Sequence, residues 1–268
     1  MLDRALGCSA LTAPLVHALP FDGFRVLHAD AWLIVLDKAH GLLSVPGIGP
    51  EKADCLATRA AQLFSGARIV HRLDRDTSGV IVMALDADTH RALSMQFQER
   101  QTSKRYIAVV GGTPVAESGE VDLPIRKNLD AAPRQMIDRV NGRPSVTRWR
   151  VLKRGARARD VIEAPASPTI DDGSPARDAE RASMAREAID GLPDPLTCAR
   201  LELEPITGRG HQLRVHLLSI GLPIVGDDLY APEPLRPPGL RMLLHATELA
   251  FTHPRTNERL TVRCDPPF

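Results

Sequence analysis

The chain has 268 residues, of which 43% are hydrophobic, and its formal net charge at pH 7 is +1. This composition is typical of a globular protein with enough apolar side chains for one large domain or two small ones. No apolar run approaches the roughly 18 to 20 residues of a membrane-spanning helix, and the first 20 residues are a poor secretory signal, so no association with a membrane is expected.

The spacing of the cysteines argues against two further classes of protein, those held by zinc and those held by disulfides. Cys8, Cys55, Cys198 and Cys264 are far apart and form no C-x-x-C pair. Zinc knuckles and dense disulfide frameworks both need closer or more numerous cysteines. We therefore expect reduced thiols and a cytoplasmic protein.

The first half of the chain shows the patterns of short strands and two helices. Residues 1–20 have the composition of a loose leader. Runs of β-branched and apolar residues between turn residues predict strands, and apolar residues three or four apart predict helices, the second of them capped by Asp88. In chain order, we expect strands at 24–28 and 32–36, a helix at 54–65, a strand at 80–85, a helix at 88–100 and a strand at 104–110.

The second half is interrupted by a polar segment. After a predicted strand at 145–151, residues 154–197 are rich in Ala, Asp, Pro and Arg and contain no aromatic residue, which predicts a flexible insertion with a weak helix at 178–189. Beyond it we expect a strand at 199–203, a helix at 211–220 that stops at Gly221, and final strands at 242–246 and 249–251. Irregular alternation of strands and helices indicates an α+β class, with residues 21–268 forming one domain.

Positive charge is concentrated in one part of this nearly neutral chain. Between Arg126 and Arg159 there are eleven Lys and Arg residues but only two acids, Asp130 and Asp138, a local excess of nine charges. Such a run is either a solvated face or a surface that binds a phosphate backbone. The sequence alone leaves both open.

The stretch HRLDRDTSG, at residues 71–79, carries the densest ionisable chemistry and lies between two apolar runs. One interpretation is a metal site. The residue types fit, but their spacing matches no ligand framework that we recognise. The candidate ligands would be His71, Asp74, Asp76, His211, His216 and His245.

A second interpretation is phosphoryl transfer. Asp74-Arg75-Asp76-Thr77 is similar to the D-x-D-x-T motif of haloacid dehalogenase-like phosphatases, and Gly226-Asp227-Asp228 to their late magnesium-binding motif. Asp74 would then be the nucleophile and Asp76 the acid. Those enzymes place the motif after the first strand of a parallel sheet, whereas here about 70 residues with strand character precede it.

A third interpretation uses the whole stretch. HRLDRDTSGVIVMAL resembles the signature H-R-L-D-x-x-T-S-G of the RluA-type pseudouridine synthases. The chain departs from the family at Gly210, where Thr or Ser is usual, and in its long 154–197 segment. Six further segments agree with the family in order: GLLSVPG at 41–47, KRYIAVV at 104–110, PITGRGHQLRVH at 205–216, GLPIVGD at 221–227, RMLLHA at 241–246 and FTHP at 251–254.

The resemblance implies a pseudouridine synthase fold with a mixed, mostly antiparallel sheet, and an isomerase that needs no metal or cofactor. It implies that Asp74 is the catalytic carboxylate, that Arg214 supplies the cation facing it, and that Tyr106 packs on the target uracil and is a candidate to assist removal of the C5 proton. Arg72 would fill or brace the space left by the flipped base, and Leu213 would form a wall of the uracil site.

The remaining implied roles concern the loop and the RNA. His71 and Thr77 would tie the loop down, and His211 would complete the nucleotide site. Arg75 is either a phosphate contact or a solvated side chain. No S4 module is expected, which favours the RluA subgroup. We expect a monomer that acts on 23S rRNA, on the tRNA anticodon stem-loop, or on both. A catalytically silent RNA-binding protein remains the alternative from another class.

Overall fold

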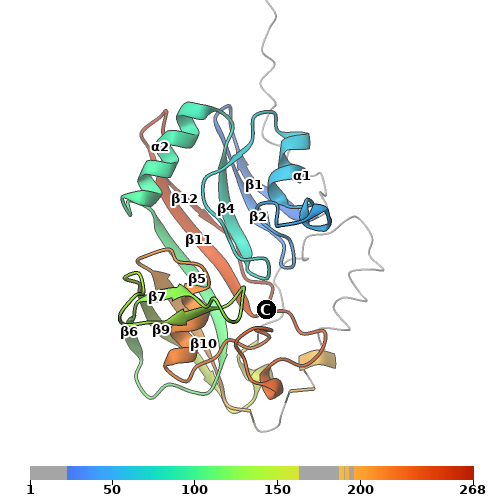
Figure 1. Cartoon of the computed structure of the whole chain (residues 1–268), viewed down its shortest axis with the longest axis vertical. Coiled ribbons are helices and arrows are strands. Elements are labelled where there is room, and N and C mark those ends of the chain that lie inside the picture. The colour runs from blue at the N-terminus through green and yellow to red at the C-terminus, as the bar shows by residue number, and fades with distance from the viewer. Residues whose placement is uncertain (1–22, 163–186, 190, 193–195) are drawn as a thin grey trace, which may run out of the picture.

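The computed structural model describes residues 23–162, 187–189, 191–192 and 196–268 (Figure 1). The predicted leader at 1–20 and most of the weak helix predicted at 178–189 lie outside these residues. The helices are α1 (Leu56–Leu63), α2 (Ala87–Gln98) and α4 (Gln212–Ser219). Short 3₁₀ turns occur at Pro50–Lys52, Ala158–Asp160 and Glu233–Leu235.

A ten-stranded sheet forms the body of the molecule. Its main path runs β1-β2-β4-β11-β5-β10-β9-β6; β12 pairs with β11 and β3 with β4. Every pairing is antiparallel except that of β4 with β11, so the sheet is mixed and mostly antiparallel, as predicted. The strands are β1 (Phe24–Ala29), β2 (Leu33–Lys38), β3 (Arg68–Ile69), β4 (Ser78–Ala84), β5 (Ser103–Gly111), β6 (Ser118–Asp122), β9 (Val146–Gly155), β10 (Cys198–Pro205), β11 (Leu244–Thr252) and β12 (Arg259–Arg263).

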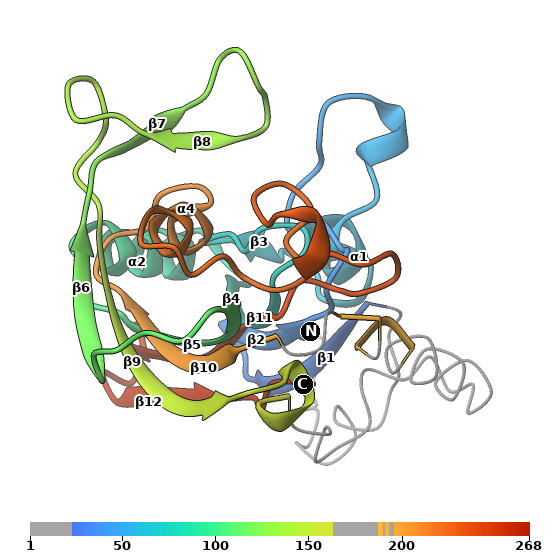
Figure 2. The ribbon, with the colours of Figure 1, turned by 90° about the horizontal axis from the view of Figure 1, so that it is seen from below.

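A separate hairpin, β7 (Ile125–Lys127) with β8 (Gln135–Ile137), stands on the side of the molecule that carries α4. Figure 2 shows it above α4, away from the main sheet. It begins the basic stretch of the sequence.

Strand β4 is buried along its whole length, as its continuous apolar sequence predicts. At its start, Gly79 pairs with Ala246 of β11 in the one parallel ladder. Gly79 has a φ of +113°, and a Cβ there would lie 2.2 Å from the Ala246 carbonyl oxygen. Only glycine therefore fits the T-S-G turn that leads out of the ionisable loop.

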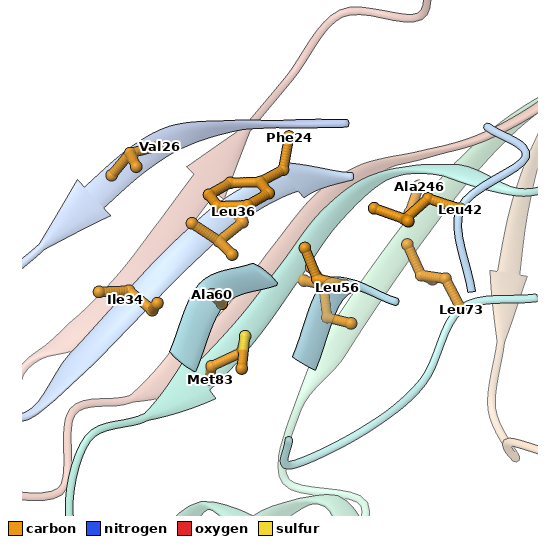
Figure 3. Close-up of a cluster of buried hydrophobic side chains, with 11 residues drawn as sticks. Phe24, Val26, Ile34, Leu36, Leu42, Leu56, Ala60, Leu73, Met83 and Ala246 are labelled. Carbon is orange, nitrogen blue, oxygen red and sulfur yellow. The ribbon is translucent and has the colours of Figure 1, made fainter. Parts of the chain in front are cut away.

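Apolar side chains cover both faces of this half of the sheet. On one face α1 packs Leu56 and Ala60 against a cluster that includes Phe24, Ile34 and Met83 (Figure 3). On the other face, the alternating residues of β2 and β4 pack with Leu93 of α2. Further along the sheet, α4 lies on β5 and β10 through Leu213 and Leu217, among others.

Two details of the predicted elements were wrong. The cap of α2 is Asp86, whose side chain accepts the Thr89 backbone N–H at 2.8 Å, while Asp88 lies within the first turn. The two strands predicted at 242–246 and 249–251 are one strand, β11, with a register shift between Ala246 and Glu248. Strands β3, β6, β7, β8 and β12 were not predicted, because they are short or have exposed polar positions that break the apolar pattern.

The structure also differs from the predicted insertion at both of its ends. Strand β9 continues to Gly155, and Ala158, Val161 and Leu192 are buried in one cluster with Cys198. These few apolar residues, separated by polar ones, gave too weak a pattern to predict a packed segment.

The longest helix in the described part of the chain is α2, with 12 residues. None of the helices described is long and apolar enough to cross a bilayer.

Candidate active site

The loop that carries Asp74 connects β3 to β4 and is held by hydrogen bonds to a neighbouring loop. The Ser44 hydroxyl donates to the Leu73 carbonyl at 2.7 Å and accepts the Leu73 N–H at 3.1 Å. The fully buried Lys38 ammonium donates to the carbonyls of Ala39 and Leu42, both at 2.7 Å, and of Arg75 at 3.0 Å. These bonds fix the backbone on both sides of Asp74.

Burial lowers the pKa of Lys38 to about 7, although the charges of Asp76 and Asp74 act in the opposite direction. An amine that satisfies three carbonyls in the protein interior stabilises the loop arrangement more through hydrogen bonds than through charge.

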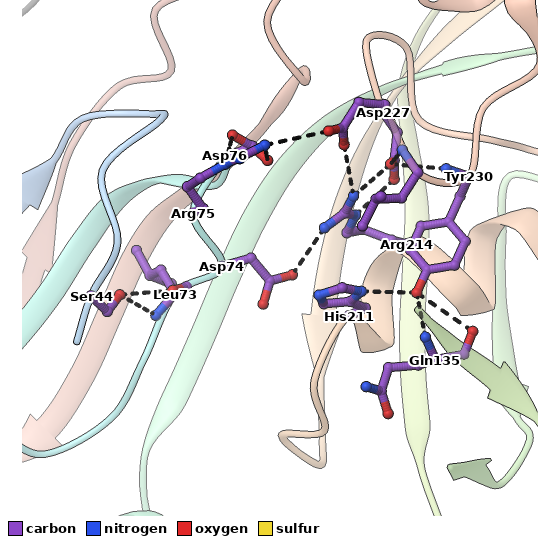
Figure 4. A network of polar contacts seen from close by, with 12 residues as sticks. Ser44, Leu73, Asp74, Arg75, Asp76, Gln135, His211, Arg214, Asp227 and Tyr230 are labelled. Atoms are coloured by element: carbon purple, nitrogen blue, oxygen red, sulfur yellow. Dashed lines mark hydrogen bonds and ion pairs between the residues drawn. The ribbon is translucent and has the colours of Figure 1, made fainter. Parts of the chain in front are cut away.

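The Asp74 carboxylate faces the guanidinium of Arg214 (Figure 4), with 3.6 Å between Asp74 Oδ2 and Arg214 Nη1. The Asp74 side chain is 28% exposed and the Arg214 side chain 2%. The acid is therefore open to a ligand, whereas the cation behind it is enclosed.

Arg214 is held in place from its other side by Asp227. Its Nε donates to Asp227 Oδ2 at 2.8 Å and its Nη2 to Asp227 Oδ1 at 2.6 Å, a bidentate pair between two buried groups. Asp228 lies 3.4 Å from Nη2, and the guanidinium carbon lies 5.0 Å from the centre of the Tyr230 ring. Burial alone would lower the pKa of Arg214, but the hydrogen bonds and charge of Asp227 more than offset it and raise the pKa.

Tyr230 connects this pair to the β7–β8 hairpin. Its hydroxyl lies 2.8 Å from His211 Nδ1 and accepts the Gln135 backbone N–H at 2.6 Å. His211 precedes α4 with a left-handed φ of 53°. Burial lowers the pKa of His211 against the opposing charge of Asp74, so the imidazole is neutral at neutral pH.

Tyr106 extends from β5 between the clusters under α1 and α4. Burial, and to a lesser extent the negative charge of Asp74, raises the pKa of the Tyr106 phenol. The phenol therefore stays protonated at neutral pH. The negative charge of Asp74 acts on the pKa values of Tyr106, His211 and Arg214, and the side chains of His211 and Arg214 lie beside it in Figure 4.

The other predicted nucleotide-binding residues occupy different environments. Leu213 is a buried residue of α4, and Thr77 is buried, with its N–H donating to the Asp74 carbonyl at 3.2 Å. Arg72 is exposed and forms no hydrogen bond or ion pair with another described residue. Arg75 forms a two-point ion pair with Asp76 and also contacts Asp228.

The predicted metal ligands are not brought together. His71 is partly buried, accepts the Val82 N–H at 3.1 Å and stacks on Phe97, and burial together with the charge of Lys104 lowers its pKa to about 3. His216 binds Thr147 and the Leu123 carbonyl. In the part of the chain that is described, the group of His, Cys and acidic side chains close enough to share an ion is Asp37, His245 and Cys264, which contains neither Asp74 nor Asp76.

The phosphatase interpretation is also wrong for this structure. Asp76 is engaged by Arg75, and Asp227, its proposed magnesium-binding partner, is engaged by Arg214. The sheet is mostly antiparallel rather than the parallel sheet that those enzymes require.

Sequence reasoning missed several residues that build the site. Ser44 and Asp227 lie in segments that matched the family, but their contacts could not be inferred. Tyr230 is one of only two tyrosines in the chain, and this rarity could have marked it as a candidate site residue. Lys38 follows the apolar run at 33–36 after one intervening acid, Asp37, and a buried lysine is rare without hydrogen-bond partners.

The basic stretch is partly neutralised by acids, most of which lie outside it. Among the described residues, ion pairs join Arg126 with Asp138, Arg148 with Glu120, Arg150 with Glu202 and Arg154 with Glu117. Four other cations around the hairpin, namely Lys127, Arg134, Arg139 and Arg143, have no ion pair with a described residue.

Comparison with known proteins agrees with this geometry. Residues 32–219 match the family model described as RNA pseudouridylate synthase. A Yersinia pestis protein named dual-specificity RNA pseudouridine synthase RluA is 37% identical over 91% of this chain and 99% of its own length. The Vibrio cholerae protein of the same name is 38% identical over 90% of this chain and 82% of its own.

Solved structures give the same result. Human RNA pseudouridylate synthase domain containing 1 superposes with a TM-score of 0.65 at 25% identity, covering 91% of this chain and 84% of its own. The human domain containing 4 protein gives a TM-score of 0.58 at 27% identity, covering 90% and 88%. The chain therefore belongs to the RNA pseudouridylate synthase family and is an isomerase that acts on uridine in RNA.

Proposed function

We propose that Asp74 is the carboxylate that attacks or assists at the target nucleotide during pseudouridine formation. The reaction breaks the bond between uracil N1 and ribose C1′, rotates the base and joins C5 to C1′. The proton lost from C5 balances the proton gained at N1, so the conversion needs no redox step. The observation that carries the proposal is the solvent-open Asp74 carboxylate, 3.6 Å from the enclosed guanidinium of Arg214.

Arg214 is proposed to hold the Asp74 carboxylate in the correct direction. Because Asp227 occupies Nε and Nη2, the guanidinium presents Nη1 to Asp74. A pre-oriented cation costs little reorganisation when charge develops at the reacting centre.

Tyr106 and Leu213 are proposed to bound the uracil. The raised pKa of Tyr106 supports a role as a neutral phenol packed on the base more than a role in removing the C5 proton. Arg72, which is exposed and unengaged by other described residues, is proposed to occupy the space left by the flipped base. Thr77 and His211 would hold the backbone around this site.

The proposed substrates are 23S rRNA and the tRNA anticodon stem-loop, bound as folded RNA with unpaired uridines. The name "dual-specificity" of the bacterial relatives supports two substrate RNAs. The cations around the β7–β8 hairpin that have no ion pair with a described residue support a phosphate contact beside the site. We also propose a monomer in the cytoplasm, where these RNAs are found. Mapping pseudouridine across rRNA and tRNA with and without the gene tests the substrates, and light scattering tests the monomer.

Asp74→Asn and Asp74→Ala should abolish tritium release from RNA labelled at uracil C5, with melting temperature and RNA affinity close to those of the wild type. Asp74 is partly exposed, and its loss should cost about 1 kcal/mol of stability or less. The matched control is Asp76→Asn in the same loop, whose carboxylate is engaged by Arg75, and it should remain active. Tritium release within tenfold of the wild type by either Asp74 variant would contradict the assignment. No release by the wild type itself would instead support a silent RNA-binding protein.

A further inference from the structure

A second cation lies on the same side of the sheet as the proposed uracil site. Lys104 precedes Tyr106 by two residues on β5, so the two side chains emerge on the same face. Its Nζ is 3.9 Å from the position that a Cβ on Gly208 would occupy. Gly208 belongs to the turn between β10 and α4, so the ammonium lies between β5 and that turn.

Among the residues that the structure describes, no acid forms an ion pair with Lys104. It is partly buried, and burial lowers its pKa, which the charge of Arg100 lowers further; no carboxylate contributes in the opposite direction. Its ammonium forms no hydrogen bond or ion pair with any residue that the structure describes. The neighbouring Arg105 differs, because it lies 3.3 Å from Glu202 and 3.5 Å from Glu248 on the opposite face.

Arg100 adds a second unbalanced charge. It lies two residues after the end of α2 and has a left-handed φ of 60°. Its side chain is exposed and has no ion pair among the described residues. Two like charges close enough to affect each other are unfavourable unless an anion is shared between them. The charge of Lys104 also reaches His71, which precedes Arg72 and Asp74 in the catalytic loop.

We propose that Lys104, assisted by Arg100, binds a backbone phosphate of the RNA next to the target uridine. The inference rests on the proposed function and names a contact of that same site. Phosphate is the anion that RNA brings to this face, and a lysine ammonium binds it as a compact point charge. The contact would position the RNA strand so that the target base enters the proposed uracil site beside Tyr106.

Salt-dependent binding of a stem-loop RNA tests the contact. Lys104→Gln should reduce the slope of log Kd against log salt by about 0.7 to 1, as expected for one lost phosphate contact. Lys104→Arg should restore the slope. Arg100→Gln should reduce the slope, and because Arg100 is exposed this substitution should not disturb folding. The control is Arg91→Gln, which removes an exposed positive charge from α2 and should leave the slope unchanged.

Substituting single phosphates locates the contact. One neutral methylphosphonate next to the target uridine should weaken binding to the wild type but cause no further loss with Lys104→Gln. At saturating RNA, Lys104→Gln should keep its kcat within about twofold while its KM rises. Equal salt slopes for Lys104→Gln and Arg91→Gln, or equal methylphosphonate sensitivity of wild type and Lys104→Gln, would overturn the inference. Tritium release by the wild type tests the proposed function separately, so the two failures are distinguishable.

Discussion

Removing Asp227 should separate the structural contribution of the buried ion pair from its catalytic contribution. Arg214 is 2% exposed and Asp227 1%, and two hydrogen bonds of 2.8 Å and 2.6 Å join them. Asp227→Ala leaves the guanidinium buried, with the more distant Asp74 and Asp228 as the remaining acids beside it among the described residues. Breaking a buried pair from one side costs about 3 to 5 kcal/mol. With about 2 °C per kcal/mol for a chain of this size, the melting temperature should fall by about 6 to 10 °C.

The matched control is the adjacent acid, which contacts the same guanidinium. Asp228 is 54% exposed and lies 3.4 Å from Arg214 Nη2, so Asp228→Ala should cost about 1 kcal/mol or less. Thermal and urea unfolding of both variants measure the difference. Equal effects of the two substitutions, or a fall of less than about 2 °C for Asp227→Ala, would refute the argument that burial makes this pair structurally important.

Replacing both partners separates stability from catalysis. The double variant Arg214→Leu with Asp227→Leu removes the buried charges together, and such replacements are often neutral or stabilising. It should therefore recover much of the stability lost in Asp227→Ala. It should recover no tritium release, because the cation that faces Asp74 is gone. Recovery of activity along with stability would show that Arg214 has only a structural role.

Three further predictions concern the loops around the site. The pKa of Lys38 is about 7 in the folded chain and ordinarily 10.5, so the unfolded chain binds more protons at pH values between these two. The unfolding free energy of the wild type should therefore rise from pH 7 to 10 relative to that of Lys38→Met. A difference between the two proteins that stays constant over this range would contradict the prediction. Gly79→Ala should lower the free energy of unfolding by about 1 to 3 kcal/mol, because the backbone is strained there and the new Cβ meets the Ala246 carbonyl. The loss should be larger than that caused by Gly41→Ala, where φ is also positive but the space around the position is open. Arg72→Ala should leave the unfolding free energy within about 0.5 kcal/mol of the wild type, yet slow modification of a stacked uridine more than that of an unstructured one; equal slowing would argue against a role in base flipping.

Much of the fold was predictable from local patterns. The continuous apolar run after the ionisable loop predicted a strand buried on both faces, and β4 is such a strand. Gly221, with a positive φ, ends α4 as predicted. The edge strands β6 and β12 were missed because alternating exposed charges hide a strand pattern. Family resemblance, rather than composition or spacing, selected Asp74 from the two acids of HRLDRDTSG.

The candidate site could be predicted only as a set of residues, without its pairings. Sequence similarity associated Asp74 with Arg214 but did not reveal that Asp227 takes most of the guanidinium. The sequence also shows a block of positive charge at residues 126–159. It does not show that Glu117, Glu120 and Glu202 neutralise part of this charge. Acids distant in sequence become partners only when strands pair and loops pack.

The sequence by itself determined which segments are apolar enough to form the sheet, where glycine is required, and which charged groups are available near residue 74. These properties depend on side-chain chemistry and short-range backbone geometry. Only the tertiary structure decided which acid each cation faces and which cations, such as Lys104, face none in the part of the chain that is described. Burial is the physical reason: it makes a compensating partner necessary for a charge, and the depth of burial follows from the packing of the whole chain.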